Sequence, residues 1–496
     1  MQVILPVGGV GKRFDGYALP KPLMDCLGKP VIFRVLDNIG DAEIHIPYNS
    51  LLSDFDFENI VKRAYPEINF YCIDFRTRGS AETVYAALNN FSGEQLAEHL
   101  LVMDADNIYQ KDILQKSKGN CIFYFEDKGD KPIYSYIAIN NGLVTNIAEK
   151  IKISDNANCG VYGFSSGLLA KVIIGDILGE NKKSKGEFYL SCVYSKMLEQ
   201  KNIVYAIKID EFYSLGTPEL LRTNELKYAE IYNLPTPPRR TNKIEMTSDV
   251  VIKNGDVDGQ IYYYHKMPED IKKYHPKLIT FNYGDFLITE KIDGITYSQL
   301  YINNCFVFSY LDKLFDYLKE VHCFTGEPEN IYANYYQKTI TRMDGYLLND
   351  VQRFDTTKNE VLDFLDNYEK KKSGKQGMIH GDTVFTNIIL DNDNNIKLVD
   401  MRGKQGGKLS VYGDIYYDYA KVWQSLIGYD EVLLGKKCNK YYKDCLKDYF
   451  RLKFINLFGA DKFEEIRWLT KGLLLSLLPI HNNEKCQEYF ELIEKV

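Results

Sequence analysis

The stretch 378–403, MIHGDTVFTNIILDNDNNIKLVDMRG, decides how the second half of the chain is interpreted. Asp382 follows a His-Gly pair, Asn387 comes five positions later, and Asp400 comes thirteen positions after Asn387. The runs IIL and IKLV flank a dense Asp/Asn turn signal, which predicts a β-hairpin that brings Asn387 and Asp400 side by side. A carboxylate that accepts a hydroxyl proton, next to two oxygen ligands for Mg²⁺, predicts a phosphoryl-transfer site. The alternative is an ordinary hairpin with a turn-capping aspartate.

This stretch resembles the choline kinase and aminoglycoside phosphotransferase branch of the protein-kinase-like fold, over about residues 240–496. The resemblance implies that Asp382 is the catalytic base and that Asn387 and Asp400 bind Mg²⁺. It implies that His380 is a structural member of the catalytic loop. It also implies ATP as the phosphate donor.

Two flanking segments agree with this resemblance. FLITEKIDGITYSQL (286–300) is similar to the hinge of these kinases, where backbone groups from Glu290 to Ile292 would meet adenine. YGDIYYDYAKVWQSL (412–426) matches the family's G-D-x-x-x-D-x-A segment. We expect Asp414 to cap a helix and to brace the catalytic loop, and Asp418 to be structural.

The segment before the hinge departs from the family pattern. VVIK places Lys253 where a strand lysine would bind the α- and β-phosphates, and a helical carboxylate should pair with it. The aligned residue is Gln260, and no G-x-G-x-x-G precedes Lys253. Lys253 is therefore either a nucleotide-binding lysine or a plain surface lysine.

The chain opens with a different motif, QVILPVGGVGKRF (2–14), followed by PKP at 20–22. A short apolar strand that runs into closely spaced glycines can bring backbone N–H groups to phosphates. The glycine spacing excludes a dinucleotide-binding fingerprint, and cations follow the glycines. Such cations would neutralise a triphosphate and its departing pyrophosphate. The nucleotide-binding candidates here are Gly8, Gly9, Gly11 and Lys12, and the catalytic candidates are Arg13 and Lys21.

These motifs resemble the sugar-nucleotidyltransferase family over about residues 1–232, in the form found in capsule-biosynthesis members. The supporting segments are RGSAETVYAAL (78–88), LLVMDADNIY (100–109), IAEKIKISDNANCGVYGF (147–164), EFYLS (187–191) and FYSLGTPELL (212–221). The resemblance implies base recognition by Gly79 and Ser80, a metal ligand at Asp106, and acceptor binding by Glu149, Lys150 and Asn158.

The departure in this half is at Ser214, where most members carry the aspartate that is their second Mg²⁺ ligand. Metal binding would then rest on Asp106, with help from Asp104, Asp210 or water. The alternative for Asp104 and Asp106 is a strand end capped by solvated acids.

Length and composition allow two domains. The chain has 496 residues with 45% hydrophobic content, and NLPTPPRRT (233–241) is typical of a semi-rigid connector. The fold class that we expect is α/β, with a Rossmann-like nucleotidyltransferase domain at 1–232 and a bilobal protein-kinase-like (α+β) domain at 242–496. Six apolar runs in the first half predict a sheet of mainly parallel strands: VILPV, EIHIPY, NFYCID, LLVMD, CIFYF and VYAIKI. Leu311, Leu314, Phe315 and Leu318 predict an amphipathic helix.

Charge and cysteine usage limit the classes of binding partner and the cellular compartment that we expect. A net charge of −7 with interspersed signs predicts no nucleic-acid partner. Ten scattered cysteines without CxxC pairs, and an amino terminus unlike a signal peptide, favour the cytoplasm. GLLLSLLPI is interrupted by Pro479, so we expect no membrane insertion. A homo-oligomeric state is left open.

Together the motifs predict a bifunctional enzyme with Mg²⁺ as cofactor. The kinase would phosphorylate a small hydroxyl compound with ATP, and the first domain would couple that phosphate to a second NTP, with CTP or UTP expected. The product would be an activated donor for surface polysaccharide synthesis. We expect a sugar or polyol alcohol as the substrate, since 39 tyrosines are too many to define an aromatic box. The alternatives are a choline or ethanolamine kinase joined to a cytidylyltransferase, and a single-activity kinase with a nucleotide-binding regulatory domain, which Ser214 and Gln260 favour.

Overall fold

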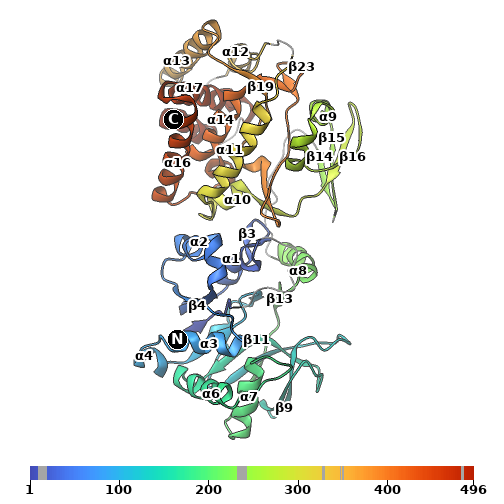
Figure 1. Cartoon of the computed structure of the whole chain (residues 1–496), viewed down its shortest axis with the longest axis vertical. Coiled ribbons are helices and arrows are strands. Elements are labelled where there is room, and N and C mark those ends of the chain that lie inside the picture. Colours follow the sequence, from blue (N-terminus) through green and yellow to red (C-terminus); the bar gives the residue numbers. More distant parts are fainter. Residues whose placement is uncertain are drawn as a thin grey trace. The chain divides into compact units, whose positions relative to one another are not determined.

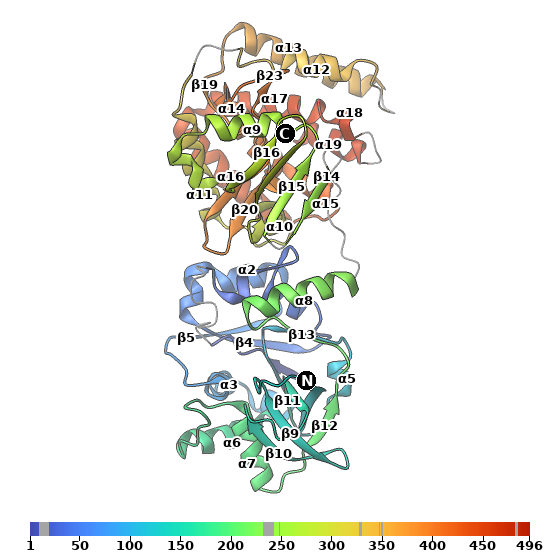
Figure 2. The same ribbon diagram turned by 90° about the vertical axis from the view of Figure 1, so that its right-hand side faces the viewer.

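The computed structural model divides into two compact units, 1–234 and 235–496. The structure describes residues 1–8, 19–231, 243–247, 249–326, 330–346, 348, 351–481 and 485–496. The predicted connector, 233–241, lies outside these residues. Figures 1 and 2 show each unit from two sides.

The first unit is built on a nine-stranded mixed sheet. In spatial order its strands are β5 (Asn69–Ile73), β4 (Glu43–Asn49), β1 (Gln2–Ile4), β6 (Leu100–Met103), β11 (Asn156–Phe164), β8 (Cys121–Glu126), β12 (Tyr205–Lys208), β10 (Leu143–Glu149) and β9 (Ser135–Asn140). Two small pairs complete the unit, namely β7 (Asn107–Tyr109) with β13 (Phe212–Ser214), and β2 (Asp25–Cys26) with β3 (Lys29–Pro30).

The strand directions correct the expectation of a mainly parallel sheet. All six predicted runs form strands of this sheet, and β5, β4, β1 and β6 pair in parallel, as do β8 and β12. The strand β11 is inserted antiparallel between β6 and β8, and β10 pairs antiparallel with both β9 and β12. The strands β9, β10 and β11 were not predicted, although Asn141-Gly142 between β9 and β10 is a hairpin signal. The strand β11 is polar at its start.

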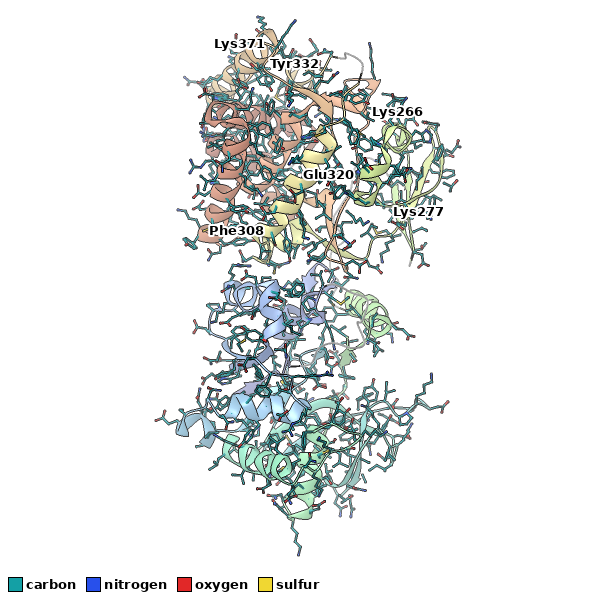
Figure 3. The ribbon with its side chains drawn as sticks, in the orientation of Figure 1. Lys266, Lys277, Phe308, Glu320, Tyr332 and Lys371 are labelled. Carbon is teal, nitrogen blue, oxygen red and sulfur yellow. The ribbon has the colours of Figure 1, made fainter. Side chains whose placement is uncertain are left out.

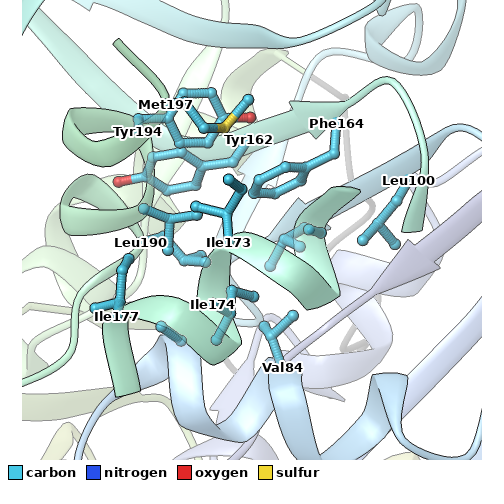
Figure 4. Close-up of a cluster of buried hydrophobic side chains, with 14 of the residues drawn as sticks. Val84, Leu100, Tyr162, Phe164, Ile173, Ile174, Ile177, Leu190, Tyr194 and Met197 are labelled. Atoms are coloured by element: carbon cyan, nitrogen blue, oxygen red, sulfur yellow. The ribbon is translucent and has the colours of Figure 1, made fainter. Parts of the chain in front are cut away.

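Helices cover the sheet, and three of them enclose a large core. The helices of this unit are α1 (Val31–Leu36), α2 (Phe57–Ala64), α3 (Ser80–Leu88), α4 (Gly93–Ala97), α5 (Ile113–Lys116), α6 (Gly167–Gly179), α7 (Leu190–Glu199) and α8 (Pro218–Ile231). Figure 4 shows Ile173 and Ile174 of α6 packed with Val84 of α3, Tyr194 of α7 and Phe164 of β11. This core fixes the start of α3 and the strand β11, which both contribute to the site.

The second unit begins with a four-stranded antiparallel sheet in the order β14 (Lys243–Met246), β15 (Val250–Asn254), β17 (Phe286–Glu290) and β16 (Leu278–Asn282). The helix α9 (Asp258–Lys266) packs on it, with Ile261 of α9 and Leu287 of β17 buried in one cluster. After β17 the chain continues into β18 (Gly294–Thr296), the first strand of a separate three-stranded sheet. In this sheet β18 pairs with β20 (Ile388–Asp391), and β20 pairs with β21 (Ile396–Leu398).

The rest of the second unit is mostly helical. Its helices are α10 (Tyr297–Ile302), α11 (Phe308–His322), α12 (Tyr336–Met343), α13 (Val351–Lys370), α14 (Ile415–Gln424), α15 (Asp430–Leu434), α16 (Lys440–Phe458), α17 (Ala460–Leu475), α18 (Leu478–His481) and α19 (Cys486–Lys495). Two short pairs are β19 (Gln376–Met378) with β24 (Tyr412–Asp414), and β22 (Lys404–Gln405) with β23 (Lys408–Leu409).

Burial explains two features of this helical part. The predicted amphipathic helix is α11, and it buries Leu311, Leu314, Phe315 and Leu318 as the periodicity requires. Every residue of α14 is buried, including Asp418 and Lys421, so this central helix holds charged groups inside the unit. Among the helices that the structure describes, none has the length and apolar character needed to cross a bilayer.

Candidate active sites

The loop that carries Asp382 is held by the fully buried side chain of Asp418. The backbone N–H groups of His380 and Gly381 donate to the two carboxylate oxygens of Asp418 at 2.9 and 2.8 Å. The Thr383 hydroxyl donates to the Asp418 carbonyl oxygen at 2.7 Å. Because hydrogen bonds to a buried carboxylate are strong, the loop is fixed on both sides of Asp382.

The bracing role that the sequence assigned to Asp414 is therefore wrong, although Asp414 does cap α14 as predicted. Its side chain accepts from the Tyr416 N–H at the helix start, from the Lys375 N–H at 3.0 Å, and from the Tyr335 hydroxyl at 2.8 Å. Burial raises the pKa of Asp414. Two acids four positions apart on one segment look alike in a sequence, and only the packing shows that Asp418 faces the loop.

Asp382 and Asn387 are joined directly. The Asn387 Nδ2 group donates to the carbonyl oxygen and to Oδ2 of Asp382, each at 3.0 Å. The predicted hairpin is confirmed, since Ile388 pairs with Leu398 across β20 and β21. The Val399 N–H donates to the Asn387 carbonyl oxygen at 2.9 Å, which places the neighbouring Asp400 beside Asn387.

Lys253 is buried, with 6% of its surface exposed, so the surface-lysine alternative is wrong. Its ammonium contacts the carboxylate of Asp400 and donates to the Gln260 side-chain oxygen at 3.2 Å. Gln260 lies on α9, at the position where the family pattern calls for a carboxylate. A neutral amide thus holds the lysine here, and the charge partner of Lys253 is Asp400.

The predicted adenine segment, from Glu290 to Ile292, starts at the last residue of β17. The Glu290 backbone N–H donates to the Lys277 carbonyl oxygen, and the Glu290 carboxylate accepts from the Lys277 N–H, both at 2.9 Å. The backbone N–H and the side chain of Glu290 therefore both bond to Lys277, the residue before β16. Ile292 lies two positions further, shortly before β18, the strand that pairs with β20.

His380 is fully buried, and its Nδ1 atom accepts from the Asp382 N–H at 3.2 Å. Its ring stacks on His275, with the ring centroids 6.2 Å apart. Burial lowers the pKa of His380, so the imidazole is neutral near pH 7. This position inside the loop matches the structural role expected for it.

Several cationic residues that were not predicted from the sequence lie around Asp382. The Lys421 ammonium lies 3.2 Å from Asp382 Oδ1, and the Arg402 guanidinium donates to the Tyr417 hydroxyl at 2.7 Å. A signal was present for Lys421, since it follows Asp418 by three positions on one helix and so shares its face. Tyr417 offered no such signal among the chain's many tyrosines.

In the first unit, the start of the glycine-rich loop lies against α3. A methyl group on Gly8 would come within 2.5 Å of the Thr83 hydroxyl, so only glycine fits there. Gly79 precedes α3 with φ +148, and a methyl group on it would meet the Phe188 backbone at 2.4 Å. Ser80 is the first residue of α3. The structure therefore brings Gly8, Gly79 and Ser80 to one helix start, whereas Gly9, Gly11, Lys12 and Arg13 lie outside the described residues.

Lys21 and Asp106 form the second pair of a lysine with a predicted metal-binding carboxylate. The Lys21 ammonium contacts Asp106 Oδ2, and both side chains remain partly exposed. Asp104 lies nearby along the same loop, and its carboxylate packs over Gly160 of β11, where a methyl group would come within 2.1 Å of it. Among the described residues, no three His, Cys, Asp or Glu side chains are close enough to share a metal ion.

Ser214 lies close to Asp106. It is the last residue of β13 and pairs with Asn107 of β7, the residue that follows Asp106. The Leu215 N–H donates to the Asp106 carbonyl oxygen at 2.8 Å. Ser214 and Asp210 line one pocket together with Glu126 and Lys208. The departure from the family pattern therefore falls beside Asp106, as the alignment of motifs predicted.

The predicted acceptor residues surround the end of β10 and the start of β11. The Glu149 carboxylate is buried and accepts from the Ser191 hydroxyl at 2.8 Å, and Lys150 donates to the Tyr189 hydroxyl at 3.0 Å. Asn158 Oδ1 accepts from the Gly160 N–H at 2.5 Å. Its buried Nδ2 group has no partner among the described residues, so it is a donor available to a ligand.

No protein-family model matches the sequence, and no curated protein matches it significantly. Solved structures similar to it include a nucleoside-diphosphate-sugar pyrophosphorylase from Vibrio cholerae RC9, with 20% identity and a TM-score of 0.40 over 46% of this chain and 100% of that chain. An inositol-1-phosphate CTP transferase from T. maritima has 14% identity and a TM-score of 0.38 over 47% of this chain and 98% of that one. A UDP-glucose pyrophosphorylase complexed with UDP-glucose has 18% identity and a TM-score of 0.37 over 46% of this chain and 98% of that one.

Proposed function

We propose that the chain is a bifunctional enzyme in which the second unit phosphorylates a hydroxyl compound with ATP and the first unit couples the resulting phosphate to CTP or UTP. The same arrangement of two residues occurs in both units and supports this proposal. In each unit a lysine ammonium contacts a carboxylate that the sequence predicts to bind Mg²⁺, namely Lys21 with Asp106 and Lys253 with Asp400. The residues of each pair are far apart in the sequence, so the fold brings them together.

The residues of the second unit fit Mg²⁺ chemically. Asp400 offers carboxylate oxygens, and Asn387 uses its Nδ2 group for Asp382, which leaves its Oδ1 atom as an oxygen ligand. A cation, the Lys253 ammonium, already contacts Asp400. Bound Mg²⁺ would neutralise the charge of the β- and γ-phosphates.

In the kinase step Asp382 accepts the proton of the substrate hydroxyl as its oxygen bonds to the γ-phosphorus and the bond to the ADP oxygen breaks. The Asp382 side chain is 40% exposed, so a substrate can reach it, and Asn387 and Lys421 hold its two oxygens. In this proposal the Lys253 ammonium would bind the nucleotide phosphates. Gln260 orients this lysine through its side-chain oxygen, so the missing carboxylate does not argue against activity.

In the first unit an oxygen of the phosphorylated alcohol attacks the α-phosphorus of the NTP, and pyrophosphate leaves. Lys21 would compensate charge on the leaving group, and Asp106 would hold Mg²⁺. Gly79 and Ser80 at the start of α3 would contact the base. Glu149, Lys150 and the free Nδ2 donor of Asn158 would bind the phosphorylated acceptor. The activated product would serve surface polysaccharide synthesis.

The experiment that tests the proposal uses the whole chain with ATP, a panel of alcohols and each NTP in turn. The proposal predicts ADP release first, and then pyrophosphate release that depends on the phosphorylated alcohol. A chain that binds NTP without releasing pyrophosphate from any phosphorylated alcohol would favour a regulatory first unit. That second candidate is supported by Ser214, which replaces a metal-binding acid beside Asp106.

A further inference from the structure

Four cationic side chains gather around Tyr417, on the side of the second unit that carries Asp382. Lys338 and Arg342 come from α12, Arg402 follows Asp400, and Lys421 lies on α14. Arg402 donates to the Tyr417 hydroxyl at 2.7 Å, and Lys338 donates to it at 3.5 Å. Lys338, Arg402 and Lys421 lie 5.8, 5.8 and 5.9 Å from the centroid of the Tyr417 ring.

This cationic cluster adjoins the proposed catalytic base. Lys421 forms an ion pair with Asp382 at 3.2 Å, and it also faces the Tyr417 ring. Lys338, Arg342 and Arg402 are each partly exposed, so solvent and ligands can reach them. A molecule bound at the cluster would therefore present a neighbouring hydroxyl group to Asp382.

The cluster has more positive charges than negative partners. Lys421 pairs with Asp382, but within the described parts of the chain Lys338, Arg342 and Arg402 form no ion pair with a carboxylate. Like charges held together in a partly buried site repel one another, and an anion would offset that repulsion.

The ionisation of two members agrees with this excess of positive charge. Burial, followed by the charges of the neighbouring arginines and Lys421, lowers the pKa of Lys338 to about 7. Burial alone would raise the pKa of Tyr417, but Arg402, Lys338 and Lys421 overcome it and lower the pKa to about 7. Neighbouring cations contribute to both shifts, whereas the pKa of Arg402 is raised, because the attraction of Tyr417 and Asp382 outweighs its burial.

We propose that the cationic cluster of Lys338, Arg342, Arg402 and Lys421 binds an anionic group, a phosphate or a carboxylate, of the compound whose hydroxyl the kinase phosphorylates. This inference rests on the proposed kinase function and narrows its substrate. It excludes choline and ethanolamine, because the Tyr417 ring already faces three protein cations and would not attract a fourth from a ligand. It also disfavours a neutral sugar or polyol, which would bring no negative charge to Lys338, Arg342 and Arg402.

The first test compares matched acceptors in the whole chain with radiolabelled ATP. The set is glycerol, glycerate, glycerol 3-phosphate and choline, together with glucose, gluconate and glucose 6-phosphate. We expect phosphorylation of an anionic member at a kcat/KM at least about tenfold above that of its neutral counterpart, because a lost charge-assisted hydrogen bond costs about that factor or more. The two kinds of anionic member distinguish a carboxylate from a phosphate. Preference for a neutral member or for choline would overturn the inference.

Variants show whether the cationic cluster binds the acceptor or the nucleotide. Lys338→Met and Arg342→Met should each raise the KM of the anionic acceptor about tenfold or more and leave the KM of ATP unchanged. The matched control is Lys371→Met, an exposed lysine after α13 that Figure 3 labels. If the two variants instead raised the KM of ATP and left the acceptor's KM unchanged, the cluster would serve the γ-phosphate, and the inference would be wrong.

A binding measurement distinguishes failure of this inference from failure of the kinase proposal. Thermal unfolding of the whole chain is followed with saturating Mg-ADP while glycerate or inorganic phosphate is added. The inference predicts a rise in Tm for the wild type and Lys371→Met that Lys338→Met lacks. Equal rises in all three proteins, or none in the wild type, would overturn the anion site. A Lys338-dependent rise with no phosphorylation of any acceptor would retain the anion site and refute the kinase.

Discussion

The ammonium of Lys253 contacts the carboxylate of Asp400, although the two residues are 147 positions apart in the chain. Lys253 lies on an inner strand of the four-stranded sheet, and Asp400 follows the hairpin strand β21. The contact therefore ties the sheet to the loop region that holds Asp382 and Asn387. In the proposed kinase, Lys253 and Asp400 would therefore act on the same phosphates.

Lys253→Met should lower the kcat/KM for ATP by about 10²-fold or more, because it removes a buried charge that would compensate the phosphates. The measurement is ATP-dependent phosphorylation at varied ATP concentration. Lys266→Met is the matched control, since Lys266 is an exposed lysine on the neighbouring helix α9 and Figure 3 labels it. Equal activity in Lys253→Met and the control would remove Lys253 from the site.

Asp418→Asn should destabilise the chain by about 2–4 kcal/mol, since a buried carboxylate that accepts several hydrogen bonds is replaced by an amide that cannot accept all of them. Urea unfolding measures the loss. The Asp418→Asn variant that does fold should also show a lower kcat, because the His380 and Gly381 N–H groups that position the loop lose a charged acceptor. Asp414→Asn is the informative comparison, and a similar fall in its kcat at equal stability would contradict the assignment of loop bracing to Asp418.

Ser214→Asp should lower the Mg²⁺ concentration that gives half-maximal nucleotidyl transfer, because it restores a carboxylate beside Asp106. We expect a shift of several-fold, measured as pyrophosphate release against Mg²⁺ concentration. Ser165→Asp adds the same charge at an exposed position and is the control. An unchanged or higher Mg²⁺ requirement in Ser214→Asp would argue against metal binding at this place.

The pH dependence of stability should carry a contribution from His275. Burial lowers the pKa of His275 to about 3, and its Nδ1–H donates to the Leu398 carbonyl oxygen at 3.0 Å. The buried Nε2 atom has no partner among the described residues, so a proton there would have no acceptor. The folded pKa lies below the unfolded value of about 6.5, so the unfolded state binds more protons between these values and stability falls as the pH drops below about 6.5.

The size of this contribution is at most about 1.4 kcal/mol per pH unit for one histidine. Urea unfolding at pH 7.5, 6.5 and 5.5 should show a shallower loss of stability in His275→Gln than in the wild type. The same slope in both proteins would show that His275 is not the group responsible.

The sequence predicted those parts of the sites that depend on local spacing. The hairpin after Asn387 follows from a few neighbouring residues. It did not predict that Asp418, rather than Asp414, would hold the loop, because both acids lie on one segment and only long-range packing separates them. It also missed the cationic cluster, since Lys338 meets Tyr417 across 79 positions.

The sheet of the first unit shows the same limit. The six predicted strands are short runs rich in apolar residues, and β1 and β6 among them are buried at every position. The missed strand β11 begins with the polar stretch Asn156–Asn158 and then buries Val161 and Phe164. Its polar start contains Asn158, which we propose to bind the acceptor, and a local pattern of apolar residues cannot reveal such a strand.

Whether the chain holds two independent sites is tested by measuring both half-reactions in Asp382→Asn and in Asp106→Asn. We expect Asp382→Asn to lose ATP-dependent phosphorylation by about 10²–10⁴-fold and to keep nucleotidyl transfer from a supplied alcohol phosphate. Asp106→Asn should show the reverse, with phosphorylation intact and pyrophosphate release lost. If both reactions fell together in either variant, with its fold confirmed by thermal unfolding, the two sites would not be independent.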